Sequence, residues 1–326
     1  GREPFLEKLF EWKDQYQSRI SNQMRRLGAS FDFSREAFTM DESRSAAVTE
    51  NFCKLFEDGI LYRENRLVNW CVYLNTTLSN LEVVQKTLPG RTLMNVPGYP
   101  PNERIEFGVI VSFVYPVVGS DEKIVVATTR PETILGDTAV AVHPDDERYK
   151  HLHGKMLQHP FIPERQVPLV TDSIAVDMAF GTGAVKITPA HDPNDYDVGK
   201  RHNLPFINIL NDDGTLNANA GEFQGMKRFS ARRAVVEALK AKGLYVETKD
   251  NPMVVPVCER SGDVIEPVMK PQWWVNCQPL AKAAVEKVQS DNMVIEPPQS
   301  KRDFFRWLEN IQDWCVSRQL WWGHRV

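Results

Sequence analysis

The chain has 326 residues, of which 42% are apolar and 25% charged, the proportions of an ordinary folded protein. This composition excludes a collagen-like, coiled-coil or disordered chain. Lys and Arg total 39 against 43 Asp and Glu, so the formal net charge is −4, which excludes a globally basic nucleic-acid binder but leaves room for a local basic face. No run of 18 apolar residues is present, so no membrane span is expected.

The chain ends and the cysteines set two further expectations. The start, Gly1 to Pro4, is neither a Met start nor a signal peptide, and the last residues, Trp321 to Val326, are rich in tryptophan. We therefore interpret the chain as a fragment of a larger protein. Its five cysteines form no CxxC pair and accompany no His cluster, so we expect free thiols, a reducing compartment and no metal.

The first 86 residues are predicted to be mostly helical. Apolar residues at helical spacing from Leu6 to Leu27 predict a first helix that ends at Gly28. A second helix is predicted over residues 43–58, with Gly59 just after it.

From about residue 90 onward short β-strands are predicted instead. A hairpin over 105–118 and 123–128 comes first, followed by strands at 138–142, 173–179 and 184–188 and a turn at 211–214. One helix is predicted here, capped by Ser230 and ended by Gly243. Many short strands with few helices predict a barrel or sandwich with inserted helices.

From about residue 263 the amino-acid composition changes again, because six of the eight tryptophans lie after this point. Trp307, Trp314 and Trp321 are seven apart, which predicts one side of a helix. Such a stripe is typical of a core, so we expect this segment to pack against the remainder of a parent protein.

The stretch from Phe180 to Asp195 is the richest in chemistry. Gly181 and Gly183 lack the third glycine of a dinucleotide fingerprint and the Gly-Lys of a P-loop, so they indicate a tight turn into a strand. In that strand, 184–188, Lys186 and Thr188 share one face, which indicates either a solvent edge or a polar pocket.

A helix is predicted to start at Asp192. Asp192 suits the N-cap, Pro193 the first position and Asp195 the third. Capping alone explains both carboxylates, and the alternative is that they converge on a ligand.

The second candidate stretch follows the strand that ends at Thr128. Thr128, Thr129 and Arg130 present two hydroxyls and a guanidinium that suit a ligand, whereas the alternative pairs Arg130 with Glu132 or Asp137. No Ser–His–Asp or Cys–His arrangement is apparent. If the protein is a hydrolase, water is therefore the expected nucleophile.

Two long motifs resemble the editing domain inserted into class I synthetases for Val, Ile and Leu. They are Thr128-Thr-Arg-Pro-Glu-Thr-Ile-Leu-Gly-Asp137 with the residues up to Pro144, and Gly181-Thr-Gly-Ala-Val-Lys186 with the residues up to Tyr196. The lysine in the second motif, the stretch Leu67 to Cys71 and the stretch Trp314 to Val326 resemble the valyl members of that family.

The resemblance implies a role for each candidate residue. Asp195 would hold the substrate ammonium, while Lys186, Thr188 and Asp192 would recognise the threonine hydroxyl and position water. The resemblance further implies that Thr128, Thr129 and Arg130 would bind the terminal adenosine. Phe180 would line the pocket. A second, hydrolytic site is needed because an apolar pocket rejects threonine in favour of valine by only about 100-fold, for which the valyl enzymes are the established example.

The function implied is hydrolytic proofreading of threonyl-tRNA(Val), and of threonyl-adenylate as a second substrate. The rival is a tRNA-binding or structural module without hydrolysis. Expected partners are the tRNA(Val) 3′ end and the rest of the catalytic domain, with no membrane. Editing would need no cofactor, and ATP with Mg²⁺ would serve only the full-length enzyme, because the HIGH and KMSKS signatures are absent here. We expect a cytoplasmic protein, with a mitochondrial form as the alternative.

The fold class expected is mixed α and β. A β-barrel-like editing domain at 89–262 would be flanked by a mostly helical segment at 1–88 and a return segment at 263–326, both parts of a Rossmann-type catalytic domain.

Overall fold

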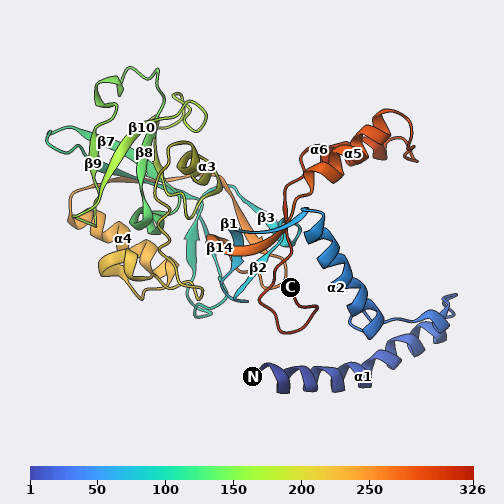
Figure 1. Cartoon of the computed structure of the whole chain (residues 1–326). Helices are drawn as coiled ribbons and strands as arrows, with labels where there is room; N and C mark the ends of the chain where they lie inside the picture. The colour runs from blue at the N-terminus through green and yellow to red at the C-terminus, as the bar shows by residue number, and fades with distance from the viewer. The chain divides into compact units, whose positions relative to one another are not determined.

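The computed structural model describes residues 1–326, which divide into two compact units (Figure 1). Unit 1 combines Gly1–Glu64 with Gln272–Val326, and unit 2 is Asn65–Pro271. No helix has the length and apolar character needed to cross a bilayer. The expected domain limits at 88 and 262 stay a prediction.

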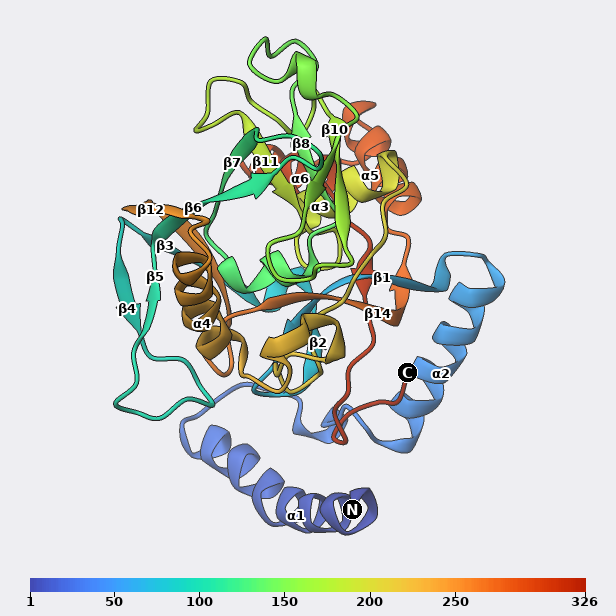
Figure 2. The same cartoon turned by 90° about the vertical axis from the view of Figure 1, so that its left-hand side faces the viewer.

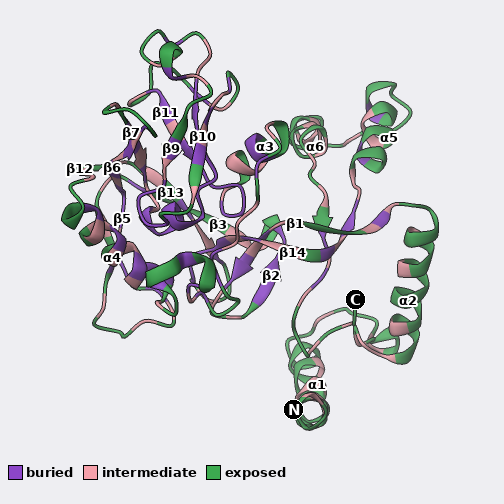
Figure 3. Ribbon diagram, turned by 60° about the vertical axis from the view of Figure 1, so that its left-hand side comes forward, coloured by how far each residue is buried: buried purple, intermediate pink, exposed green.

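Unit 1 consists mainly of helices with little buried surface. They are α1 (Arg2–Arg26), the 3₁₀ helix η1 (Phe33–Arg35), α2 (Glu42–Glu57), α5 (Gln278–Gln289) and α6 (Ser300–Glu309). The predicted ends of α1 and α2 are confirmed, since Gly28 and Gly59 follow them with φ of +78° and +69°. Figure 3 shows α1 and α2 with mostly exposed residues, and neither buries a single one.

The predicted helical stripe of tryptophans is wrong. Helix α6 ends at Glu309, Trp314 lies in β15 (Trp314–Cys315), and Trp321 lies in coil. Strand β15 pairs antiparallel with the end of β14 (Glu266–Val275). The backbone around Trp314 therefore makes its hydrogen bonds to a neighbouring strand, although the seven-residue spacing had predicted a helix there. The return segment at 263–326 was expected to be part of a Rossmann-type domain, and this antiparallel pairing does not support that expectation.

The prediction of helix up to residue 86 is wrong after residue 60. Strands β1 (Leu61–Cys71) and β2 (Thr76–Leu78) form a hairpin around Asn75, whose φ is +53°, and the 3₁₀ helix η2 (Asn80–Glu82) leads into β3 (Val83–Leu88). Strand β3 pairs with β13 (Met253–Cys258), which is far away in the sequence. Local periodicity cannot reveal such a partner.

Two sheets carry most of unit 2 (Figure 2). The first has the order β12 (Tyr245–Asp250), β6 (Val109–Pro116), β7 (Lys123–Thr128), all antiparallel, so the predicted hairpin is confirmed. The second has the order β11 (Ala184–Ile187), β8 (Ala139–Val142), β10 (Gln166–Thr171), β9 (Met156–Gln158). Only β8 and β10 run parallel in it. A separate pair joins β4 (Thr92–Met94) and β5 (Ile105–Phe107).

The mixed α and β class is confirmed, but the strands do not close into one barrel. After β7 the chain turns into the 3₁₀ helix η3 (Pro131–Gly136), and Pro131 cannot extend a ladder. A single bridge, Val117 with Leu157, links β6 to β9. The predicted strand at 173–179 is also wrong, because the Asp172 side chain accepts hydrogen bonds from the N–H groups of Ile174 and Ala175 and so turns the chain.

Two helices of unit 2 position the residues considered below. Helix α3 (Pro193–Arg201) follows β11, and α4 (Arg228–Ala241) contacts η3 and β12. Ser230 is not the cap of α4, because the helix begins two residues earlier, after Lys227 in extended backbone. Gly243 follows the end of α4 with φ of +66°, as predicted. Short 3₁₀ helices η4 (Lys150–Leu152) and η5 (Ala218–Phe223) complete the unit.

The core of unit 2 lies between its two sheets and α4. Its central members are fully buried, among them Phe113, Tyr115, Ile124, Leu157 and Val235. Every second residue along β6 is buried, and two of these, Phe113 and Tyr115, contribute their side chains to this core. Tyr115 brings a hydroxyl into this core and therefore needs a hydrogen-bond partner there.

Candidate functional site

Lys186 lies inside the protein rather than at a solvent edge. Its side chain is only 8% exposed, and Nζ donates to Thr133 Oγ1 at 2.9 Å, to Asp137 Oδ1 at 3.1 Å and to Thr188 Oγ1. The predicted shared face of Lys186 and Thr188 is confirmed. All three ammonium donors are used, so Lys186 reaches a ligand only by exchanging one of these bonds.

Asp137 is the counter-charge that keeps Lys186 stable in the interior. The Asp137 carboxylate is fully buried and also accepts from Thr188 Oγ1 and, at 2.5 Å, from the Tyr115 hydroxyl. Burial raises the pKa of the Asp137 carboxyl, and the Lys186 ammonium opposes that rise. A lone buried charge would be costly, so the pair and its three hydroxyls act as one unit.

The predicted start of α3 is confirmed. Asp192 caps the helix through Oδ1, which accepts from the N–H groups of Asn194 at 2.8 Å and Asp195 at 3.2 Å, and Pro193 opens the first turn. Asp195 Oδ2 accepts from the Thr188 N–H at 2.8 Å. The other oxygen of each carboxylate has no hydrogen-bond partner, so both are open to a ligand or water.

The electrostatics of Asp195 differ from those of an ordinary exposed acid. Burial raises its pKa to about 7, with Asp192 and Asp137 adding to the rise and Lys186 and the Thr188 N–H opposing it. A cation arriving at Asp195 would favour its ionised form, because an opposite charge lowers a carboxyl pKa. The site is therefore suited to a positively charged group.

Arg130 is engaged with the protein itself. Its guanidinium donates to the His191 carbonyl oxygen at 2.7 Å and to Glu266, and its Nε lies 3.5 Å from Glu132. The alternative pairing with Glu132 is thus observed, whereas the pairing with Asp137 is not, because Asp137 is bound to Lys186. The Arg130–His191 bond ties the threonine motif to the segment before Asp192.

The remaining predicted residues are less closely gathered. Thr128 is buried and its hydroxyl oxygen accepts from the Arg130 N–H at 3.0 Å, while Thr129 is partly exposed. Phe180 is 69% exposed, so it lines no closed pocket. Gly181 and Gly183 both have positive φ, of +58° and +71°, which confirms the tight turn predicted after it.

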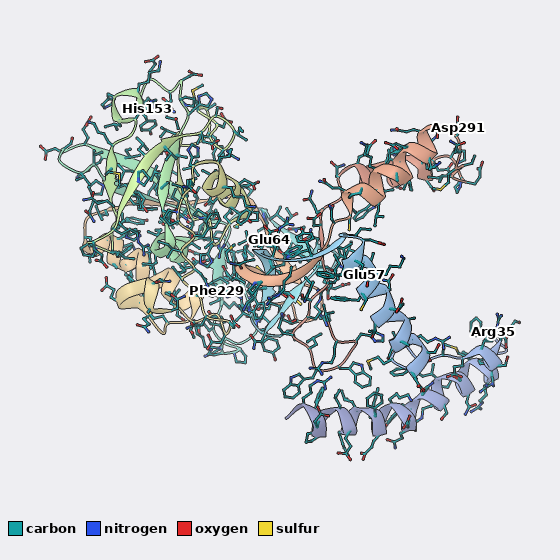
Figure 4. The ribbon with its side chains drawn as sticks, in the orientation of Figure 1. Arg35, Glu57, Glu64, His153, Phe229 and Asp291 are labelled. Carbon is teal, nitrogen blue, oxygen red and sulfur yellow. The ribbon has the colours of Figure 1, made fainter.

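A cavity of about 550 Å³ lies beside Thr129, lined by residues of α4, β6 and β12. Phe229, labelled in Figure 4, forms part of its wall, and Lys186 and Asp195 do not. Four of its five cations are already paired, namely Arg91 with Glu106, Arg232 with Glu132, Arg233 with Glu103 and Lys240 with Glu237. The carboxylates at the start of α3, rather than this cavity, are therefore the candidate site considered below.

Sequence reasoning did not identify Asp137, Tyr115 or Glu266 as parts of the site. Asp137 lies within the first motif, and a buried lysine requires a counter-charge, which is the signal that could have found it. Nothing local to Tyr115 or Glu266 points to the site. No group of three or more His, Cys, Asp or Glu side chains is arranged to hold a metal ion.

The whole chain, residues 1–326, matches the family model described as tRNA synthetases class I (I, L, M and V). The chain therefore belongs to the class I tRNA synthetases.

Within that family the similar curated proteins are valine–tRNA ligases. The protein of Schizosaccharomyces pombe is 65% identical over the whole chain, which covers 33% of that relative. The mitochondrial protein of Saccharomyces cerevisiae is 62% identical with 29% of it covered, and the human protein is 54% identical with 26% covered. The chain thus spans about a third or less of these relatives.

A solved structure, the Agrobacterium radiobacter K84 agnB2 LeuRS-tRNA-LeuAMS ternary complex, aligns with 78% of this chain and 37% of its own. The identity is 18% and the TM-score is 0.33, so the likeness carries no argument here.

Proposed function

We propose that unit 2 is the hydrolytic proofreading site of a valyl-tRNA synthetase, which removes threonine from mischarged threonyl-tRNA(Val) and acts on threonyl-adenylate as a second substrate. The observation that carries the proposal is the pair of carboxylates at the start of α3. Asp192 and Asp195 each keep one oxygen without a partner, next to the buried cluster of Lys186, Thr188 and Asp137. The relatives named valine–tRNA ligases support the substrate class.

In the proposed reaction the Asp195 carboxylate binds the ammonium of the threonyl group, and Asp192 holds the attacking water. The water oxygen adds to the ester carbonyl, the bond from that carbon to the ribose oxygen breaks, and the water proton passes to the departing ribose oxygen. Threonine and free tRNA result. The rate gain comes mainly from holding water and ester in the reactive arrangement.

Selection against valine follows from the polar character of the pocket. Lys186 can exchange one of its present hydrogen bonds for a bond to the threonine hydroxyl. A valine methyl in the same place would displace that bond without replacing it. An unpaired buried polar group costs about 1–3 kcal/mol, so we expect valine to be rejected by about 5- to 150-fold.

The other assignments follow the same proposal. Thr128, Thr129 and Arg130 would hold the terminal adenosine, although Arg130 must then bind it with the donors that its present partners leave free. Phe180 would line the pocket from its exposed edge. The partners are the tRNA(Val) 3′ end and the rest of the catalytic domain. Editing uses no cofactor, and ATP with Mg²⁺ serves only aminoacylation by the full-length enzyme. We place the protein in the cytosol, with mitochondria as the alternative.

The test compares deacylation of Thr-tRNA(Val) and Val-tRNA(Val) by the full-length protein and by Asp195→Asn. We expect the wild type to prefer the threonyl ester by at least about fivefold. Asp195→Asn should lose at least about 100-fold in rate, because it loses the ammonium partner. Asp197→Asn is the matched control, since Asp197 is exposed on the same helix and should keep full activity.

Equal rates on both esters, or an Asp195→Asn variant as fast as the wild type, would refute the proposal. The rival, a binding or structural module without hydrolysis, predicts no deacylation above the uncatalysed rate, and an effect of Asp195→Asn on melting temperature alone.

A further inference from the structure

A line of six alternating charges crosses unit 2 beside the proposed site. In order of contact they are Asp263, Arg228, Glu266, Arg130, Glu132 and Arg232. Three are acids and three are bases, so the line is neutral. Because an unpaired ion in the protein interior is strongly destabilising, each member of the line depends on the residues that it contacts.

Glu266, the first residue of β14, is the central link of this line. Its carboxylate is 2% exposed, and both of its oxygens are committed: Oε2 accepts from Arg228 Nη1 at 2.9 Å, and Oε1 accepts from Arg130. Arg228 is itself 2% exposed and is held at 2.8 Å by Asp263. Glu266 is therefore a fixed anchor for the Arg130 guanidinium.

Arg130 transmits this anchoring to α3. Its Nη1 donates to the carbonyl oxygen of His191, the residue before the helix cap Asp192. The His191 ring is fully buried, and its Nε2 accepts from the Ile209 N–H at 3.0 Å, so the segment is held on both sides. The position of Asp192 thus depends on Arg130, and that of Arg130 on Glu266.

We infer that Glu266 is a positioning residue of the hydrolytic site, which holds Arg130 against the His191 carbonyl and thereby fixes Asp192 over its water. The inference rests on the proposed function. Glu266 touches no substrate, so its loss should act on the rate of the chemical step rather than on substrate affinity. Misplacement of a reacting group by about 1 Å costs up to about 100-fold in rate.

The experiment measures kcat and KM for Thr-tRNA(Val) deacylation in the full-length protein. We expect Glu266→Gln to lower kcat by about tenfold or more and to leave KM within about twofold. Asp146→Asn is the matched control, because it removes another buried carboxylate from an arginine, Arg148, that lies outside this line of charges. It should lower the melting temperature in a similar way and keep kcat within about twofold.

A double-mutant cycle tests whether Glu266 acts through Arg130. Arg130→Lys keeps the charge but loses the two-pronged contact, so adding Glu266→Gln to it should lower kcat no further. If Glu266→Gln melts too low to assay, Glu266→Asp takes its place, with an expected loss of at least about threefold because its reach is one methylene shorter.

The inference is overturned by wild-type kcat in Glu266→Gln, by an equal loss in Asp146→Asn, or by fully additive losses in the cycle. Failure of the proposed function looks different. In that case the wild-type protein does not deacylate Thr-tRNA(Val), or Asp195→Asn is as fast as the wild type, whatever Glu266 does.

Discussion

At the scale of single residues, burial rather than residue type gives this site its character. Lys186 and Asp137 are both interior, and each is stable there only because the other is present. Asp195 lies near them, and burial raises its pKa to about 7 against 3.8 for an ordinary aspartate. The folded protein therefore holds the Asp195 proton more tightly than the unfolded chain does.

This raised pKa makes stability depend on pH. Between pH 4 and 7 the unfolded chain loses the Asp195 proton first, so the contribution of Asp195 to stability is complete at low pH and is lost as the pH rises through about 7. Asp195→Asn cannot titrate. Relative to wild type, its free energy of unfolding should gain about 1–2 kcal/mol between pH 5 and pH 8.

Urea denaturation at pH 5 and pH 8 measures this gain. Asp197→Asn, an exposed change on the same helix, is the control and should show the same difference from wild type at both pH values. If Asp195→Asn also differs from wild type by the same free energy of unfolding at pH 5 and pH 8, the buried environment of Asp195 is contradicted.

At the scale of elements, α3 is placed by a close approach to the strand end before it. A Cβ on Gly199 would lie 2.7 Å from Pro189 Cβ, 2.9 Å from Pro189 Cγ and 3.0 Å from Phe206 Cζ. Gly to Ala inside a helix normally stabilises by about 1 kcal/mol. Here the methyl would push α3, and the carboxylates at its start, away from the motif segment.

Gly199→Ala should therefore destabilise the protein by about 1–2 kcal/mol in spite of its better helix propensity, because overpacking outweighs that gain. It should also slow deacylation of Thr-tRNA(Val). Lys200→Ala, an exposed neighbour on α3, serves as the control. A melting temperature of Gly199→Ala above that of wild type would show that α3 is free to shift.

At the scale of the whole molecule, the two units differ in how many apolar residues each buries in its own interior. Four hydrophobic clusters, built on Phe113, Phe107, Ala139 and Cys71, lie within residues 65–271. In unit 1, α1, α2 and α6 bury no residue. Unit 2 thus has a contiguous apolar interior of the kind that cooperative folding requires, whereas these three helices of unit 1 contribute no buried residue.

Expressed by itself, the segment 65–271 should fold and melt in one cooperative transition. Circular dichroism and calorimetry measure this, and the segment 1–64 is the comparison, expected to be partly helical without a cooperative transition. A segment 65–271 that binds hydrophobic dyes and shows no transition would mean that unit 2 needs the residues of unit 1 in order to fold.

Part of the fold and site was predictable because it depends on residues close together in the chain. Asp192 as cap, Pro193 in the first turn and the positive φ at Gly183 follow from local backbone chemistry. The hairpin of β6 and β7 follows from a short turn between β-branched runs. Predictions failed where a distant partner decides, as for β3, which had been assigned to helix but pairs with β13.

By itself the sequence determined the family motifs, the local turns and caps, and the shared face of Lys186 and Thr188. Only the tertiary structure decided which charges meet. Asp137 lies 49 residues before Lys186, and Glu266 lies 136 residues after Arg130, so their pairing depends on how the sheets and helices bring the chain together. The physical reason is burial: it turns Lys186 and Arg130 from exposed cations into groups that need a counter-charge, and local spacing does not show where that charge comes from.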